Sequence, residues 1–148
     1  MNAYAAQQQY SHNHIATASP EQILIMLYDG AIRFTRQAIK ASEQNIQTEK
    51  LGRISKAFAI ITEFSNTLNH DIGGHIAEDL DGLYQFMLRE LNKAGSEPGE
   101  KSLKVVEGLL VDLRQTWAEA ILVNKKEIEQ RAQERFNRSK HSAIAVAS

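Results

Sequence analysis

The sequence predicts an all-α protein, an antiparallel up-down four-helix bundle with a flexible N-terminal arm and a C-terminal tail. Three observations lead to this prediction. In four segments of about twenty residues, apolar residues recur every three to four positions, the spacing that places them on one face of a helix. No segment alternates between apolar and polar residues as a half-buried strand would. Short linkers separate the four segments, and such linkers make consecutive helices antiparallel neighbours.

The first helix is expected from Pro20 to Ala41. Ser19 is a suitable N-cap residue, and Gln22 completes a capping box with it. Pro20 suits the first helical position, because its missing N–H would be unpaired there anyway. Two adjacent apolar rows follow, one with Ile23, Leu27, Gly30, Ala31, Phe34, Ala38 and Ala41, the other with Leu24, Tyr28 and Ile32. Two such rows make a wider apolar face than a two-helix seam needs.

Three further helices are expected at Glu49 to His70, His75 to Ala94 and Ser102 to Ala120. Gly73-Gly74 interrupts the apolar pattern and is a usual place for a left-handed helix cap. The run Gly-Ser-Glu-Pro-Gly at 95–99 is a strong loop signal. These two runs separate the second helix from the third and the third from the fourth.

The predicted domain organisation has three parts. Residues 1–18 form a flexible arm, rich in Gln, Asn, His and Ala, with isolated apolar residues at Tyr10 and Ile15. Residues 19–120 form the four-helix bundle. Residues 121–148 form a helical extension that frays into a disordered tail, because amphipathicity fades after Ile121 and residues 143–147 carry no helix-sized apolar face.

Composition excludes several function classes. The formal net charge is −1 and the pI is about 6.5, so there is no basic excess for binding nucleic acid. The absence of cysteine excludes disulfides, zinc fingers and iron–sulfur clusters. The N-terminus lacks the features of a signal peptide, and the longest apolar run, Ile23 to Tyr28, is too short to span a membrane. We therefore expect a soluble cytoplasmic protein without membrane insertion.

No catalytic or metal-binding pattern is found. Bundles with di-iron sites carry Glu-x-x-His on two helices, whereas here His75-Ile76-Ala77-Glu78 reverses that order and has no counterpart. His12 and His14 lie in the arm, and His70 and His75 are interpreted as solvated residues at helix ends. We expect no enzymatic activity, no metal and no cofactor. A ferritin-like metalloenzyme and a phosphotransfer bundle are the competing classes. This sequence lacks the functional residues of both.

The surplus of apolar residues is more informative. The apolar rows of the first three helices are wider than one central core requires, and Tyr28, Phe64, Tyr84 and Phe86 are expected near their edges. One interpretation is that these rows seat the neighbouring helices. The other is a surface groove for an amphipathic segment of a partner, over which the arm lies when the groove is empty.

The chain resembles the flagellar secretion chaperone FliS family. The resemblance covers residues 10–120 and starts with Tyr10, Thr17-Ala18-Ser19-Pro20-Glu21-Gln22 and Leu27-Tyr28-Asp29-Gly30-Ala31-Ile32-Arg33-Phe34. It continues with Lys56-Ala57, Ile60-Ile61, Leu68-Asn69, Gly73-Gly74-His75-Ile76-Ala77, Leu80, Leu83-Tyr84, Met87, Arg89 and Leu91. It ends with Glu107-Gly108-Leu109-Leu110, Leu113-Arg114 and Trp117-Ala118-Glu119-Ala120.

The resemblance implies a cytoplasmic export chaperone. Such a protein binds the disordered C-terminal segment of flagellin, prevents premature polymerisation and delivers flagellin to the flagellar type III export gate. The expected flagellin-binding residues are Tyr10, Ile15, Leu24, Tyr28, Ile32, Phe64, Leu68, Leu83, Tyr84 and Met87. The protein is expected to be a monomer or a weak homodimer. The alternative is a helical-bundle adaptor for another amphipathic helix. Two features depart from the family pattern: His75, where Glu is frequent, and the tail beyond Ile121.

Overall fold

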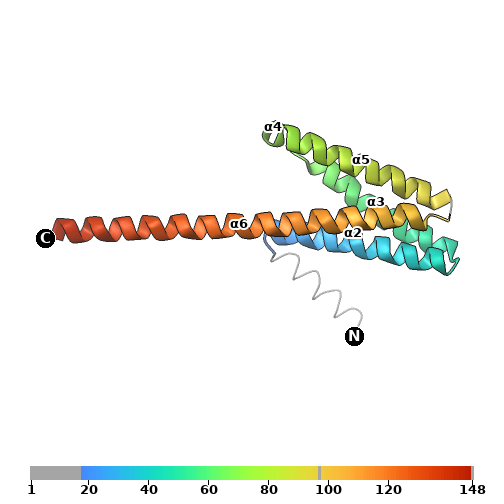
Figure 1. The fold of residues 1–148 in the computed structure, drawn as a ribbon, viewed down its shortest axis with the longest axis horizontal. Coiled ribbons are helices and arrows are strands. Elements are labelled where there is room, and N and C mark those ends of the chain that lie inside the picture. The colour runs from blue at the N-terminus through green and yellow to red at the C-terminus, as the bar shows by residue number, and fades with distance from the viewer. Residues whose placement is uncertain (1–17, 97, 148) are drawn as a thin grey trace, which may run out of the picture. The chain divides into compact units, whose positions relative to one another are not determined.

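The computed structural model describes residues 18–96 and 98–147. Its elements are α2 (Pro20–Glu43), α3 (Gln47–Thr67), α4 (His70–Gly73), α5 (His75–Ser96) and α6 (Glu100–Ala147), shown in Figure 1. No strand occurs among the described residues. The four long helices confirm the predicted all-α bundle, and the four-residue helix α4 is an addition that the sequence did not predict.

The chain divides into two compact units, one that ends at Arg114 and one that begins at Gln115. The first unit contains α2, α3, α4, α5 and the part of α6 up to Arg114. The second contains the rest of α6. The three-part division predicted from the sequence, with boundaries after residues 18 and 120, remains a prediction.

Helix α2 begins as the sequence predicts. The Gln22 backbone N–H donates to Ser19 Oγ at 3.2 Å, and the Ser19 backbone N–H donates to Gln22 Oε1 at 2.9 Å. This reciprocal pair is a capping box, with Pro20 at the first helical position. The helix ends at Glu43, two residues beyond the predicted end. Asn45 then takes a positive φ of 58°, a conformation that asparagine tolerates better than most residues.

The junction between α3 and α5 differs from the prediction. Helix α3 ends at Thr67 and not at His70, because Leu68 has an extended backbone with ψ of 133°. The short helix α4 follows, and Gly74 has a φ of +51°. A left-handed glycine was predicted at this point and is confirmed. Its freedom from a Cβ penalty allows the chain to turn directly into α5.

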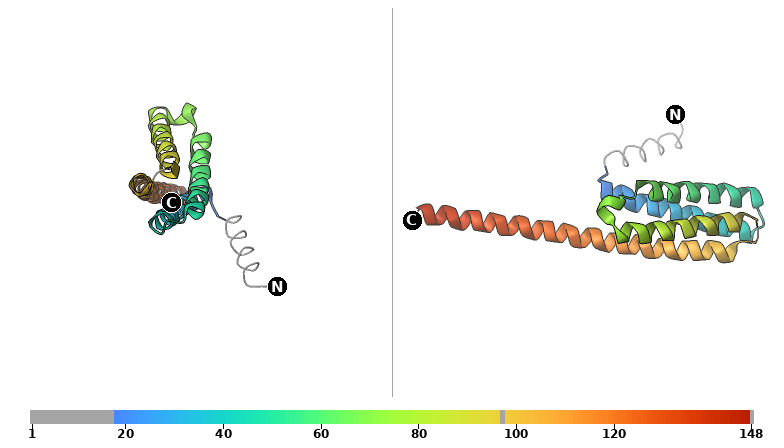
Figure 2. Two further views of the ribbon diagram at one scale, coloured as in Figure 1. Left: turned by 90° about the vertical axis from the view of Figure 1, so that its right-hand side faces the viewer. Right: turned by 90° about the horizontal axis from the view of Figure 1, so that it is seen from above.

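Contacts within the first unit fix the antiparallel order. Between α2 and α6, Asp29 forms an ion pair with Arg114, and Arg36 forms one with Glu107. Residue numbers therefore rise along α2 while those of their α6 partners fall, so the two helices run antiparallel. Phe64 near the end of α3 contacts Tyr28 near the start of α2 and Tyr84 of α5. Figure 2 shows the same up-down arrangement. The largest fully buried side chains are Tyr28, Ile61, Met87, Leu91, Leu103 and Leu110.

Helix α6 is longer than the sequence predicted. It continues to Ala147 through residues 143–147, where fraying was expected. Side-chain hydrogen bonds between residues four apart, Gln115 to Glu119 and Gln133 to Asn137, support it in the second unit. Four large apolar side chains of this unit are more than half exposed: Leu122, Val123, Ile128 and Phe136. None of the helices in the described ranges combines the length and apolar character needed to cross a membrane.

Candidate functional site

An aromatic cluster joins three helices inside the first unit. The Phe64 ring of α3 stacks on the Tyr28 ring of α2, with centroids 4.4 Å apart and an interplanar angle of 22°. Its other neighbour is the Tyr84 ring of α5, at 5.6 Å. The two tyrosine hydroxyl oxygens lie 2.7 Å apart and share a hydrogen bond. Each tyrosine therefore buries its ring and still satisfies its polar end.

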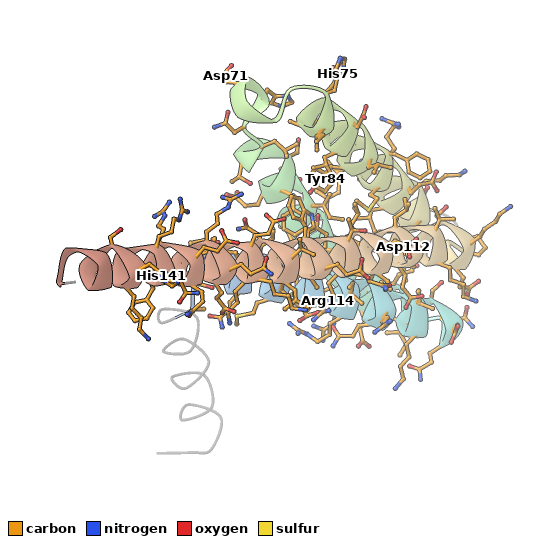
Figure 3. All side chains as sticks on the ribbon, turned by 60° about the vertical axis from the view of Figure 1, so that its left-hand side comes forward. Asp71, His75, Tyr84, Asp112, Arg114 and His141 are labelled. Carbon is orange, nitrogen blue, oxygen red and sulfur yellow. The ribbon has the colours of Figure 1, made fainter. Side chains whose placement is uncertain are left out.

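Five of the residues that the sequence predicted for partner binding lie in the core: Tyr28, Ile32, Phe64, Tyr84 and Met87. The expectation that Tyr28, Phe64 and Tyr84 lie near the edges of their apolar rows is wrong. These rings face one another because the second apolar row of α2, and not only the first, points at α3 and α5. Figure 3 shows Tyr84 directed into the bundle.

The other predicted binding residues have different positions. Leu24, Leu68 and Leu83 are half-buried. Each lies within about one helical turn of a member of the aromatic cluster, because Leu24 precedes Tyr28 by four positions and Leu68 follows Phe64 by four. Tyr10 and Ile15 lie outside the described residues.

The second turn of α2, which follows Glu21 and Gln22, is apolar on every side. Residues 23–27, Ile-Leu-Ile-Met-Leu, are all half-buried and none is in the core. At about 100° per residue, five consecutive positions span the whole circumference of a helix. An ordinary amphipathic helix would carry polar residues on part of that circumference. This helix end therefore presents apolar surface that the bundle core does not cover.

Helix α5 adds apolar surface at the same end of the bundle. Antiparallel packing brings the start of α2, the end of α3 and the start of α5 together around the aromatic cluster. Ile76 in the first turn of α5 is 71% exposed, and Leu80 and Leu83 are half-buried. We call residues 23–27, Leu68, Ile76, Leu80 and Leu83 the apolar end. Of the residues at the apolar end, only Leu24, Leu68 and Leu83 were predicted from the sequence to bind a partner. Ile76 and Leu80 were missed, although their helical spacing with Leu83 was a signal for them.

Polar contacts flank the apolar end. Ser65 Oγ donates to Asp81 Oδ1 at 2.5 Å, and Gln85 Nε2 donates to Ser65 Oγ at 3.0 Å. The hydrogen bond from Ser65 is the main cause that lowers the pKa of the Asp81 carboxyl. On the opposite side of α2, Arg114 donates to Asp29 at 2.5 Å, a contact that raises the pKa of the Arg114 guanidinium. These contacts fix α3 to α5 and α2 to α6.

The histidines at the start of α5 and in α4 are solvated, as predicted. The His75 side chain is 99% exposed, and its nearest acidic partner is Glu78, with Nδ1 3.8 Å from Oε2. Figure 3 shows His75 and Asp71 at the α4 end of the bundle, pointing away from it. Among the described residues, no group of three or more His, Asp or Glu side chains is arranged to hold a metal ion.

Comparison with known proteins identifies the family. A family model described as "Flagellar protein FliS" matches residues 1–144. The chain belongs to the FliS family. This confirms the resemblance seen in the sequence.

Individual relatives agree with this family assignment. The FliS-family chain is 34% identical over 126 residues to the flagellar secretion chaperone FliS of Bacillus subtilis (strain 168), covering 85% of this chain and 91% of that one. It is 35% identical over 104 residues to FliS of Salmonella typhimurium (strain LT2), covering 70% and 77%. A crystal structure of a bacterial flagellar chaperone matches with a TM-score of 0.65 at 22% identity, covering 81% of this chain and 98% of that one. The last likeness supports the fold alone.

Proposed function

We propose that this FliS-family protein is a cytoplasmic flagellar secretion chaperone. It binds the disordered C-terminal segment of flagellin, prevents premature polymerisation and delivers flagellin to the flagellar type III export apparatus. The observation that carries the proposal is the apolar end of the bundle, in a chain whose relatives are named flagellar secretion chaperones. Apolar side chains left partly exposed together at one end of a domain favour a protein interaction site there.

The energetics suit a disordered client. Ordering a flexible segment on binding costs about 2–5 kcal/mol or more of the gross interaction energy. Burial of one Leu- or Ile-sized side chain contributes about 1.5–3 kcal/mol. The apolar end offers nine such side chains, all partly exposed, so a few client contacts offset the cost of ordering. Client binding at this surface therefore requires no nucleotide.

The predicted binding residues divide into two roles in this proposal. Leu24, Leu68 and Leu83 contact the client directly, because they are half-buried at the apolar end. The five core residues shape that surface from beneath. The N-terminal arm, through Tyr10 and Ile15, is proposed to cover the surface in the absence of client and to take part in client recognition.

The first test uses the client itself. We expect intact flagellin to bind in isothermal titration calorimetry, and flagellin that lacks its C-terminal segment to show no measurable binding. The isolated segment should bind and gain helicity by circular dichroism, because it becomes ordered on the bundle. Equal binding of flagellin with and without the segment would refute the proposed function.

The second test addresses the apolar end. Ile76→Glu places a charge where the client buries an apolar side chain, and we expect the Kd for flagellin to rise about 10- to 100-fold. Because Ile76 is 71% exposed, the fold should be unaffected. The matched control is Leu51→Glu on α3, where Leu51 is 44% exposed at the opposite end of the bundle. Affinity for flagellin should be unchanged in the control, and equal losses in the two variants would contradict this placement of the client.

A further inference from the structure

A groove runs between α2 and α6 in the first unit. Its volume is about 580 Å³. Two apolar side chains, Ile32 and Val111, and four cations, Arg33, Arg36, Lys40 and Arg114, line it. Asp29 supplies the only carboxylate among the described lining residues. The groove therefore combines an apolar component with a positive rim.

Two of the four cations are neutralised by partners. Arg36 Nε lies 2.7 Å from Glu107 Oε2, and Arg114 Nε lies 2.5 Å from Asp29 Oδ1. Within the described part of the chain, Arg33 and Lys40 have no ion-pair partner. Arg33 lies over the Phe34 ring at 5.1 Å, a contact that leaves its N–H donors available. The groove thus carries two uncompensated positive charges, both on exposed residues of α2.

Gln37 provides an independent observation in the same groove. Its Oε1 atom is buried and has no hydrogen-bond partner among the described residues. Buried polar atoms are nearly always paired, and an unpaired one calls for an explanation. The Gln37 residue itself is only half-buried and lines the groove, so its side-chain amide is a polar group that a bound segment can contact. Gln37 lies on α2 between Arg33 and Lys40, so one bound segment can reach all three.

We propose that this groove binds an acidic segment of the client. The segment places carboxylates against Arg33 and Lys40, apolar side chains over Val111 beside the largely buried Ile32, and a polar group against the side-chain amide of Gln37. The groove begins at Asp29, two residues beyond the apolar end, so a client bound there continues along α2 without a break. This inference rests on the proposed function, because it assigns the acidic segment to flagellin.

Charge reversal tests the inference. In calorimetry with intact flagellin, the double variant Arg33→Glu/Lys40→Glu should raise the Kd about tenfold at low ionic strength. The difference should shrink at high ionic strength, because salt screens exposed charges. The matched control Arg89→Glu/Lys93→Glu makes the same charge change on exposed residues of α5, outside the groove. This control should change the Kd for flagellin much less than the groove variant does.

Gln37→Leu separates binding from folding. Removal of an unsatisfied buried oxygen should leave the unliganded protein equally or more stable in urea unfolding, whereas the Kd for flagellin should rise about fivefold. If wild type binds flagellin and both groove variants bind it equally well, the inference is wrong and the proposed function stands. If wild type does not bind flagellin, the proposed function fails and the inference fails with it.

Discussion

Phe64→Ala is expected to lower the free energy of unfolding by about 3–5 kcal/mol, a large part of the roughly 5–15 kcal/mol typical of a domain. Phe64 is 4% exposed and touches both tyrosines of the aromatic cluster. Truncation removes the ring's transfer free energy and leaves a cavity among α2, α3 and α5. It also removes the geometric preference of the two aromatic pairs. Urea unfolding followed by near-ultraviolet circular dichroism measures the loss.

Two further variants make this result interpretable. Phe136→Ala is the same change in the second unit, where the side chain is 62% exposed, and it should shift the free energy of unfolding by less than about 0.5 kcal/mol. Phe64→Leu keeps much of the volume and should cost only about 1–2 kcal/mol, so a folded variant remains if alanine is not tolerated. A loss in Phe64→Ala no greater than in Phe136→Ala would contradict the placement of Phe64 at the centre of the bundle.

Local signals in the sequence predicted the helices well. Ser19, Pro20 and Gln22 fix the start of α2 through groups that lie within four residues of one another, so the signal is complete in the sequence. The glycine at position 74 likewise indicates the left-handed backbone that the structure has at that residue. The end of α3 could not be predicted in this way, because the apolar pattern continues through Leu68 although the backbone there is extended.

Buried polar residues depend on hydrogen-bond partners that the apolar pattern of the sequence does not reveal. Ser42 is buried because its hydroxyl donates to Pro98 O in the segment before α6 and lies 3.3 Å from Oε1 of Glu100, the first residue of α6. No pattern around Ser42 contains that information. Thr35 is buried because its hydroxyl donates to Ala31 O, at 2.8 Å in its own helix, which lets a polar side chain occupy a core position. A core predicted from apolar residues alone therefore omits both Ser42 and Thr35.

The apolar surplus was predictable, but its distribution was not. Two apolar rows on α2 are equally compatible with either row facing the core, and the choice depends on how α3 and α5 pack. The structure places Tyr28 and Ile32 of the second row inside and leaves Leu24 of the same row half-buried near the helix end. The aromatic residues favoured for a surface role are therefore core, and the exposed Ile76 is the clearer surface residue.

Gly99→Ala is expected to destabilise the protein by about 2–4 kcal/mol. Gly99 has a φ of +75°, a conformation in which a Cβ atom is strained. A Cβ at this position would also lie 2.6 Å from the Ala94 backbone oxygen, a contact that only movement of the main chain can relieve. The Gly99 carbonyl accepts the Leu103 backbone N–H at 2.9 Å, so such movement disturbs the first turn of α6. Leu103 is fully buried, and the disturbance therefore reaches the core.

Gly108→Ala gives the matched control with the opposite sign. Gly108 is exposed in α6 within the first unit, and a Cβ there would meet no atom within 4 Å. Alanine should raise the free energy of unfolding by about 0.5–1 kcal/mol, because glycine loses more backbone entropy in a helix. Urea unfolding of the two variants measures both changes on one scale. A Gly99→Ala protein as stable as wild type would show that the turn into α6 does not require a left-handed residue.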